Sequence, residues 1–540
     1  MALRELVDLR QDAAALCADL AQVQLAVARG TPFPRALTEI VRAHRLSCSH
    51  DGLAQAVEAL ARATNPARTA RLASLRDFLV RARALALDPG AAQELLEFPR
   101  RPSVRLHGDP GLHGALPPVV AERDLPTLRE REERADMEAA LAQAERGAAA
   151  ARTAAWEAAQ SALSEVAAGD PFDGALALHE RGWIPPGKIE ETPPPQGEPD
   201  ERKPDDSPLV RGAAPLEAPV DPVARACESF LRETDSLARD LGGWLLERET
   251  GARPSPGGAE RHDLLRFIRS PRCAGAFPAG ELLRTVRRWA EMLRLDLRAG
   301  GTIELEQDDR PLQPSGARAV PLDPPHEVRI VVRIAEGPHA VGELLAAVGC
   351  AQLRAGPPPD APPEDLWWGD AALDPACGAL LSGLLLDAEW LRRCAQADLP
   401  RDDERAIAMA ALLESRLCAA RALASLEAHR AGLGARAEQA NRELHARAAL
   451  TDLPAGLALR ELDPWLAAWG ELRGRALAAA LRVVLRERFD EDWWRNPRSL
   501  AALQGLWSRG GRPTAAELWA EIPAAPSLEA LSRELAHACE

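Results

Sequence analysis

The chain has 540 residues, a net charge of −15 at pH 7 and a sequence isoelectric point of about 5.4. This acidic balance disfavours binding to nucleic acid, because the average surface would repel a polyanion. No apolar stretch reaches the roughly 18 residues that a membrane-spanning helix needs, so we expect no membrane association. The nine cysteines are an odd number without a Cys-x-x-Cys motif, which indicates reduced thiols and a cytoplasmic protein.

Two residue types are rare or missing. Lys188 and Lys203 are the only lysines among 66 basic residues, and the chain has no tyrosine. A GC-rich, bacterial type of genome explains the scarcity of lysine codons. The missing tyrosine has a chemical consequence, because no reaction step can use a phenol to donate a proton or to stabilise an oxyanion.

Residues 1–183 have the apolar spacing of helices throughout and are predicted to form an N-terminal helical region. The run from Arg129 to Val166 is rich in Ala, Glu and Arg and contains no proline, which predicts one long helix or two. We expect the Glu and Arg side chains of this run to form a solvated face.

Residues 184–222 differ in composition from the rest of the chain. Eleven prolines lie among Glu, Asp, Gly and Ser, and there are few apolar side chains to offset the entropy of ordering the segment. We therefore predict a Pro-rich flexible linker.

Helical spacing returns over 223–249 and 281–295, and the strand material follows. Thr302–Glu306 alternates apolar and polar residues, and Glu327–Ile334 is rich in β-branched residues and also alternates. We expect these two strands to pair in a small sheet. From Pro338 to the end of the chain the pattern is helical again.

Several segments after residue 223 occur in an order typical of a known family. The segments are Asp309–Pro311, Val328–Ile334, Glu343–Ala355, Asp370–Leu373, Leu384–Leu391, Ala467–Arg482 and Arg488–Trp494. Together they resemble the zinc metallopeptidases of the thimet oligopeptidase and oligoendopeptidase F type, which are gluzincins. In these enzymes a strand leads into a helix that carries His-Glu-x-Gly-His. The resemblance implies a mainly α-helical, zincin-like body over 223–540, with a small sheet (about 302–334) edging a deep cleft.

The residues that bind zinc in that family are missing from this chain. A catalytic zinc ion needs two His at i and i+4 on one helix face, a neighbouring Glu as general base, and a third ligand. The resemblance places Ala346 at the first His, Ala347 at the Glu, Cys350 at the second His and Pro375 at the third ligand. We therefore expect neither catalytic zinc nor any other cofactor.

Two functions are compatible with the missing zinc ligands. In the first, the chain is a catalytically inactive pseudoenzyme that binds a peptide or a protein partner. In the second, it is a hydrolase with a rebuilt active site that uses Cys350, Cys377, His339 or Glu343. His339 and Glu343 are spaced as a common surface pair on a helix, and a buried thiol is more often inert than reactive. The sequence favours the first function and leaves the oligomeric state open.

Overall fold

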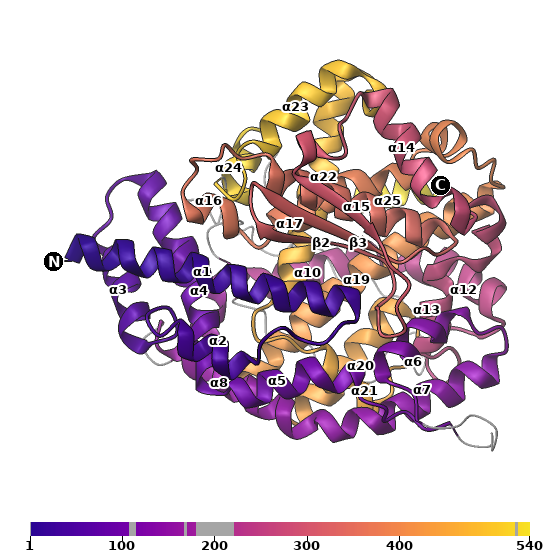
Figure 1. Cartoon of the computed structure of the whole chain (residues 1–540). Coiled ribbons are helices and arrows are strands. Elements are labelled where there is room, and N and C mark those ends of the chain that lie inside the picture. The colour runs from indigo at the N-terminus through magenta and orange to yellow at the C-terminus, as the bar shows by residue number, and fades with distance from the viewer. Residues whose placement is uncertain (1, 107–114, 167–169, 180–220, 513, 524–526) are drawn as a thin grey trace, which may run out of the picture.

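The structure is a computed structural model that describes residues 2–106, 115–166, 170–179, 221–512, 514–523 and 527–540. The predicted linker 184–222 lies outside the described residues, apart from its last two positions. Figure 1 shows a helical body with one small sheet.

The N-terminal region is helical, as its apolar spacing predicts. Local capping sets several of the helix starts. The side chains of Asn65 and Asp88 each accept a hydrogen bond from a backbone N–H of the first turn, and a proline follows each of them at the first helical position. The helices are α1 (Ala2–Arg29), α2 (Leu37–Ala43), α3 (His50–Ala61), α4 (Pro66–Leu87), α5 (Pro89–Glu97), α6 (Pro118–Asp124), α7 (Arg131–Glu145), α8 (Ala149–Ser164) and α9 (Pro171–Ala177).

The helix predicted over 223–249 is interrupted in the structure. A π-helical turn at Ala238–Gly242 separates its two main parts, and Gly242 packs closely on the Met409 side chain there. The helices of this part are α10 (Pro222–Glu233), α11 (Asp235–Leu237), α12 (Gly243–Thr250), α13 (Arg261–Arg269) and α14 (Leu282–Leu293).

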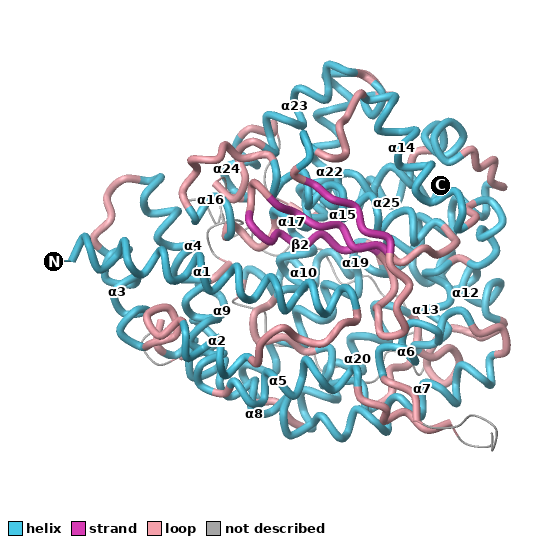
Figure 2. Tube along the Cα trace, in the orientation of Figure 1, coloured by secondary structure: helices cyan, strands magenta, loops and turns pink. Residues whose placement is uncertain are grey.

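The sheet has three strands in the order β1-β3-β2 and lies at the centre of the molecule (Figure 2). β1 (Ile303–Gln307) pairs in parallel with β3 (Glu327–Val332), so the predicted pairing of these two strands is confirmed. β2 (Ala317–Asp323) pairs antiparallel with β3 on the other side and was not predicted.

Both faces of the sheet are covered by helices. Val320, Leu322 and Val331 pack with residues of α1, which runs alongside the sheet, below the strands in Figure 1. The alternate residues Val328 and Ile330 belong to the main core, to which α15 (Pro338–Ala355) contributes. The period-2 alternation of β3 thus supplies apolar side chains to both faces, as expected for a central strand.

The C-terminal part is helical from residue 338 onward. Its helices are α15 (Pro338–Ala355), α16 (Pro363–Trp367), α17 (Leu373–Ser382), α18 (Ala388–Trp390), α19 (Arg401–Ala431), α20 (Ala435–Ala449), α21 (Ala455–Ala458), α22 (Ala467–Phe489), α23 (Pro497–Trp507), α24 (Ala515–Ala520) and α25 (Glu529–Cys539). One hydrophobic core extends from Leu6 to Cys539, so the N-terminal helices and the C-terminal part pack into a single body.

Candidate functional site

Helix α15 carries Ala346, Ala347 and Cys350, to which the family resemblance assigns the zinc motif, and two residues set its start. Gly337 has φ +96°, a conformation that favours glycine, and its N–H donates to the Phe277 carbonyl oxygen at 2.9 Å. Pro338 occupies the first turn, where no intrahelical partner for an N–H is needed. The chain can therefore turn from β3 into α15 within the short segment 333–337.

Helices α15 and α17 pack backbone against backbone. A Cβ atom on Gly349 would lie 2.1 Å from the Cys377 carbonyl oxygen, so only glycine fits there without a shift of the helices. A Cβ atom on Gly378 would lie 3.4 Å from both the Cβ of Ala346 and the Sγ of Cys350. Small residues therefore bring the two helices into direct contact.

The three motif positions on α15 have different surroundings. Ala346 and Cys350 are half-buried and share the face toward α17, as their i and i+4 spacing requires. Ala347 is 4% exposed and belongs to the main core. The Cys350 thiol donates to the Asp374 carbonyl oxygen at 3.3 Å.

Pro375 lies on a different side of α17 from this contact. A Cβ atom on Gly474 of α22 would lie 2.6 Å from the Cβ of Pro375, so this proline faces α22. The residue of α17 that adjoins both Ala346 and Cys350 is Gly378. The assignment of the third ligand to position 375 stays a prediction, and the geometry offers position 378 as the alternative.

These residues do not fit a catalytic zinc ion, which needs three protein ligands and one open position. Ala346, Pro375 and Gly378 have no donor atom in their side chains. Cys350 has one, but burial raises the pKa of its thiol to about 12, which disfavours the thiolate that binds metal.

The second thiol proposed for a rebuilt site is also protonated at neutral pH. Cys377 is buried, and this burial raises the pKa of its thiol well above the ordinary value. All nine cysteines are unpaired. Neither Cys350 nor Cys377 therefore has the lowered pKa that activates a nucleophilic cysteine.

An ion pair joins α15 to α17 beside the thiols. The Nε of Arg354 donates to the Asp374 carboxylate at 3.1 Å, and its Nη1 donates to the Leu366 carbonyl oxygen at 3.0 Å. Arg354 thereby connects α15, α17 and α16. The positive charge beside the two thiols therefore belongs to Arg354, which is already paired with Asp374.

The structure brings His339 and Glu343 together near the start of α15. The Nε2 of His339 lies 3.5 Å from a Glu343 carboxylate oxygen, and Arg269 Nη1 lies 3.7 Å from the other oxygen. Burial raises the pKa of Glu343, but the neighbouring His339 and Arg269 outweigh it and lower the pKa overall. Within the described part of the chain, no group of three metal-ligating side chains converges on α15 or α17.

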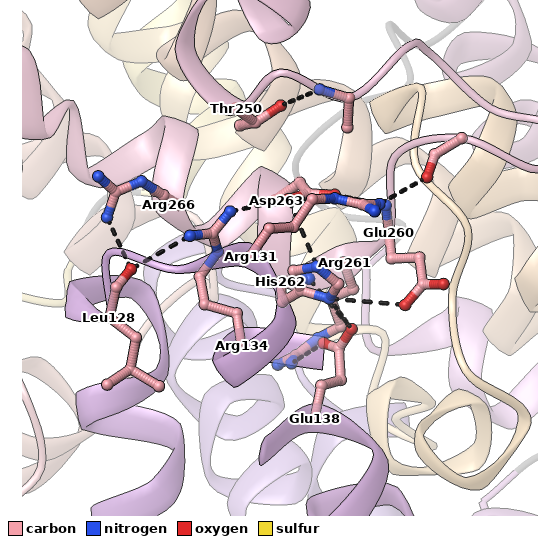
Figure 3. A network of polar contacts seen from close by, with 12 residues as sticks. Leu128, Arg131, Arg134, Glu138, Thr250, Glu260, Arg261, His262, Asp263 and Arg266 are labelled. Carbon is pink, nitrogen blue, oxygen red and sulfur yellow. Dashed lines mark hydrogen bonds and ion pairs between the residues drawn. The ribbon is translucent and has the colours of Figure 1, made fainter. Parts of the chain in front are cut away.

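A second polar region connects α7 to the start of α13 (Figure 3). Asp263 is fully buried and accepts hydrogen bonds from Arg131 at 3.0 Å and from Arg134 at 3.1 Å. The same carboxylate accepts the Glu260 backbone N–H at 3.1 Å and completes a capping box at the start of α13. Asp263 thus caps one helix and binds two arginines of another.

Glu138 of α7 is also buried and contacts α13. Its Oε1 accepts from Nη1 of Arg261 at 3.2 Å, and its Oε2 accepts from the His262 backbone N–H at 3.1 Å. The His262 Nδ1 lies 3.0 Å from this Oε2 and 3.5 Å from a Glu260 carboxylate oxygen. Figure 3 shows both carboxylates directed at the His262 ring.

The polar region continues toward α19 and α21 through Arg261, which also contacts Glu122 and Glu461. Burial raises the pKa of Glu461, but the charges of Arg421 and Arg261 outweigh it, and the pKa is lowered to about 2. Burial also lowers the pKa of His445 to about 4, so this imidazole is neutral at pH 7. The carboxylate of Glu461 is therefore held ionised between two arginines.

The prediction that the Glu and Arg side chains of the run 129–166 form a solvated face is wrong for three residues. Arg134, Glu138 and Glu145 are buried, at 1%, 1% and 4% exposure. Their partners include Asp263 and Arg261, which lie more than a hundred residues away in the sequence, so the run gives no local sign of them. The sequence signal that could have drawn attention to this region is the run of four titratable residues from Glu260 to Asp263.

Solved structures of metallopeptidases resemble the chain over nearly its whole length. A protein described as an oligoendopeptidase F from Bacillus anthracis has a TM-score of 0.54 and 10% identity, over 91% of this chain and 83% of that one. An M32 carboxypeptidase from Deinococcus radiodurans has a TM-score of 0.53 and 14% identity, over 100% of this chain and 99% of that one. A carboxypeptidase from Pyrococcus furiosus has a TM-score of 0.54 and 11% identity, over 100% and 99%.

At these identities the likeness shows the fold alone. No protein-family model and no curated protein matches the sequence. The chain therefore has the fold of the helical, zincin-like metallopeptidases, and the predicted mainly α-helical body with a small sheet is confirmed.

None of the described helices combines the length and the apolar composition that crossing a membrane demands.

Proposed function

We propose that the chain is a catalytically inactive, metallopeptidase-like pseudoenzyme that acts by binding a peptide or a protein partner. The observation that supports this most is the contact between α15 and α17, where Ala346, Cys350 and Gly378 meet without a set of zinc ligands. A fold can persist after such a loss, because the residues that pack the core are not those that perform the chemistry.

A charged pair on α22 offers a place for a bound peptide. Arg475 Nη2 donates to Glu471 at 2.7 Å, and its Nη1 lies 3.6 Å from the Glu414 carboxylate on α19. The side chains of Arg475 and Glu471 remain 22% and 44% exposed, so a ligand can reach both. A guanidinium binds carboxylate and carbonyl oxygens, and a carboxylate binds peptide N–H groups.

A binding assay tests this function. Purified full-length chain is mixed with a pool of fluorescent peptides of varied sequence and charge, and anisotropy reports binding. We expect binding that the double variant Glu471→Gln/Arg475→Gln weakens by about tenfold or more, because charge-assisted hydrogen bonds are lost. The matched control is Glu58→Gln/Arg62→Gln, an exposed i, i+4 pair at the C-terminal end of α3.

Two results would contradict the proposed function. One is peptide and protein binding no stronger than that of an unrelated acidic protein of similar size. The other is an equal loss of binding in both double variants, which would indicate a nonspecific effect of charge.

The alternative, a hydrolase rebuilt around Cys350, has less support. The raised pKa of Cys350 leaves little thiolate at neutral pH, and its thiol donates to a backbone carbonyl rather than to a base. His339 is paired with Glu343 instead. Alkylation of the native protein at pH 8 should therefore leave Cys350 unmodified, and any hydrolysis that Cys350→Ala abolishes would favour this alternative.

A further inference from the structure

We propose that Glu138, Glu260 and His262 bind one divalent transition-metal ion of the Zn²⁺ class. The ion would connect α7, from the N-terminal helical region, to the start of α13, which follows the predicted linker in the sequence. This metal site is separate from the positions on α15 and α17 and has no part in peptide hydrolysis.

The first argument is the spacing of the three ligand atoms. The Nδ1 of His262 lies 3.0 Å from Glu138 Oε2 and 3.5 Å from Glu260 Oε2, and the three atoms all lie within 4.8 Å of one another. Metal–ligand bonds of about 2.0–2.2 Å place neighbouring tetrahedral ligands roughly 3.4 Å apart. A cation can therefore replace the Nδ1 proton with only small movements of the two carboxylates.

The second argument does not depend on Glu138 or Glu260 and concerns the other ring nitrogen of His262. The His262 ring is fully buried, yet its Nε2 has no hydrogen-bond partner and lies 3.4 Å from Asp263 Oδ1. With the ring proton on Nδ1, the Nε2 lone pair would face a carboxylate oxygen. A metal ion on Nδ1 leaves the proton on Nε2, where it can be donated to Asp263, as in carboxylate–histidine–metal arrangements.

The surrounding residues hold the ligands in place. Arg261 donates to the Oε1 of Glu138 and leaves the Oε2 directed at His262. The charge of Arg261 is offset by Glu122 and Glu461, so it need not exclude a second cation. The Glu260 side chain is 48% exposed, which gives an ion access from solvent.

The donor set indicates the class of ion. One imidazole nitrogen and two carboxylate oxygens suit Zn²⁺, Co²⁺ or Mn²⁺, whereas Mg²⁺ and Ca²⁺ prefer oxygen ligands throughout. Three protein ligands leave one or more positions for water. Because these ligands lie on α7 and at the start of α13, which are far apart in the sequence, metal binding should stabilise the folded chain.

Metal titration of the full chain tests the site. The protein is treated with a chelator, and Zn²⁺ binding is followed by calorimetry and Co²⁺ binding by visible absorption. We expect one ion per chain and a rise in Tm. Glu260→Gln, which keeps a capping oxygen at the start of α13, should weaken Zn²⁺ binding by at least ~10–100-fold. The matched control is Glu517→Gln, because Glu517 belongs to the capping box of α24 and should not affect binding.

Further variants separate this proposal from the proposed function. His262→Asn keeps a donor toward Glu138 and removes the imidazole, so it should also weaken Zn²⁺ binding, while Cys350→Ala should leave it unchanged. Absence of stoichiometric binding, or wild-type affinity in Glu260→Gln, would overturn the metal site and leave the pseudoenzyme proposal intact. Binding that only Cys350→Ala abolishes would overturn the metal site and contradict the loss of zinc on α15.

Discussion

The contact between α15 and α17 differs in chemistry from the polar region between α7 and α13. In the first, Gly349 and Gly378 allow two helix backbones to meet, and the side chains at the motif positions are small. In the second, Asp263, Glu138 and Arg261 are buried and paired across helices. Within the described residues, the three side chains whose ligand atoms converge, Glu138, Glu260 and His262, therefore lie between α7 and α13 and not on α15.

The two regions also differ in what stabilises them. Backbone packing between α15 and α17 depends on shape, so it is sensitive to any added atom. The polar region depends on complete pairing, because a buried charge that loses its partner costs far more than a surface charge does. Each of the following predictions changes one region and leaves the other intact.

The largest effect is expected from Arg261→Met. The substitution removes the partner of Glu122, Glu138 and Glu461 and should lower the free energy of unfolding by about 3–5 kcal/mol. Urea denaturation measures this change. Arg62→Met is the control, since the pair of Arg62 with Glu58 is exposed and contributes less than about 0.5 kcal/mol. Equal stability of the two variants would show that the polar region is not stabilising.

The next effect is a loss of stability in acid that arises from Glu461. The pKa of this group is about 2 in the folded chain, against an ordinary value of 4.5. The unfolded chain therefore takes up the proton first, and the stability present above pH 4.5 is lost as the pH falls toward 2. The contribution at pH 7 is on the order of 3 kcal/mol.

Denaturation profiles of wild type and Glu461→Gln between pH 7 and pH 3 measure this contribution. The difference in unfolding free energy between the two proteins should shrink below pH 4.5, because the amide that replaces the carboxylate in the variant cannot titrate. Glu529→Gln, at an exposed position of α25, should follow the wild-type profile. A constant difference between wild type and Glu461→Gln across this range would contradict the lowered pKa.

A smaller effect is expected from Gly349→Ala, which tests the contact between α15 and α17. The added methyl group meets the Cys377 carbonyl oxygen and should destabilise the fold by about 1–3 kcal/mol, despite the better helix propensity of alanine. In Gly505→Ala on α23 nothing lies within 4 Å of the new Cβ, so this control should be stabilised by up to about 1 kcal/mol. A Gly349→Ala protein as stable as the control would mean that the helices are not in direct contact.

The smallest effect is expected when the zinc motif is introduced at the predicted positions on α15. The triple variant Ala346→His/Ala347→Glu/Cys350→His should show no zinc-dependent peptidase activity, since neither Pro375 nor Gly378 supplies a third ligand. Adding Gly378→Glu or Pro375→Glu to the triple variant compares the two candidate positions on α17. Activity of the triple variant by itself would show that the third ligand comes from another residue.

The sequence predicts much of the fold from local patterns. Helical spacing identifies most helices, and alternation identifies β1 and β3 with their pairing. β2 was missed because it contains Pro321 and only one β-branched residue. It is an edge strand, where a residue without an N–H is tolerated, so tertiary pairing with β3 determines it rather than local propensity.

The candidate site could be predicted only in part. The i, i+4 spacing correctly places Ala346 and Cys350 on one face of α15, because helical geometry fixes their relation. The choice between Pro375 and Gly378 depends on where α17 begins and how it is rotated about its axis. The sequence of the segment between α15 and α17 does not reveal either. The ion pairs of Glu138 and Asp263 join segments that are distant in the sequence, so no local pattern predicts them.

Hydrolysis of a mixed pool of quenched fluorescent peptides by the purified full-length chain, with Zn²⁺ added, tests the central claim most directly. The account predicts no zinc-dependent cleavage above that of buffer, even at Zn²⁺ concentrations that saturate the site proposed between α7 and α13. Zinc-dependent cleavage that Cys350→Ala abolishes would contradict the account, because it would place a working metal site between α15 and α17.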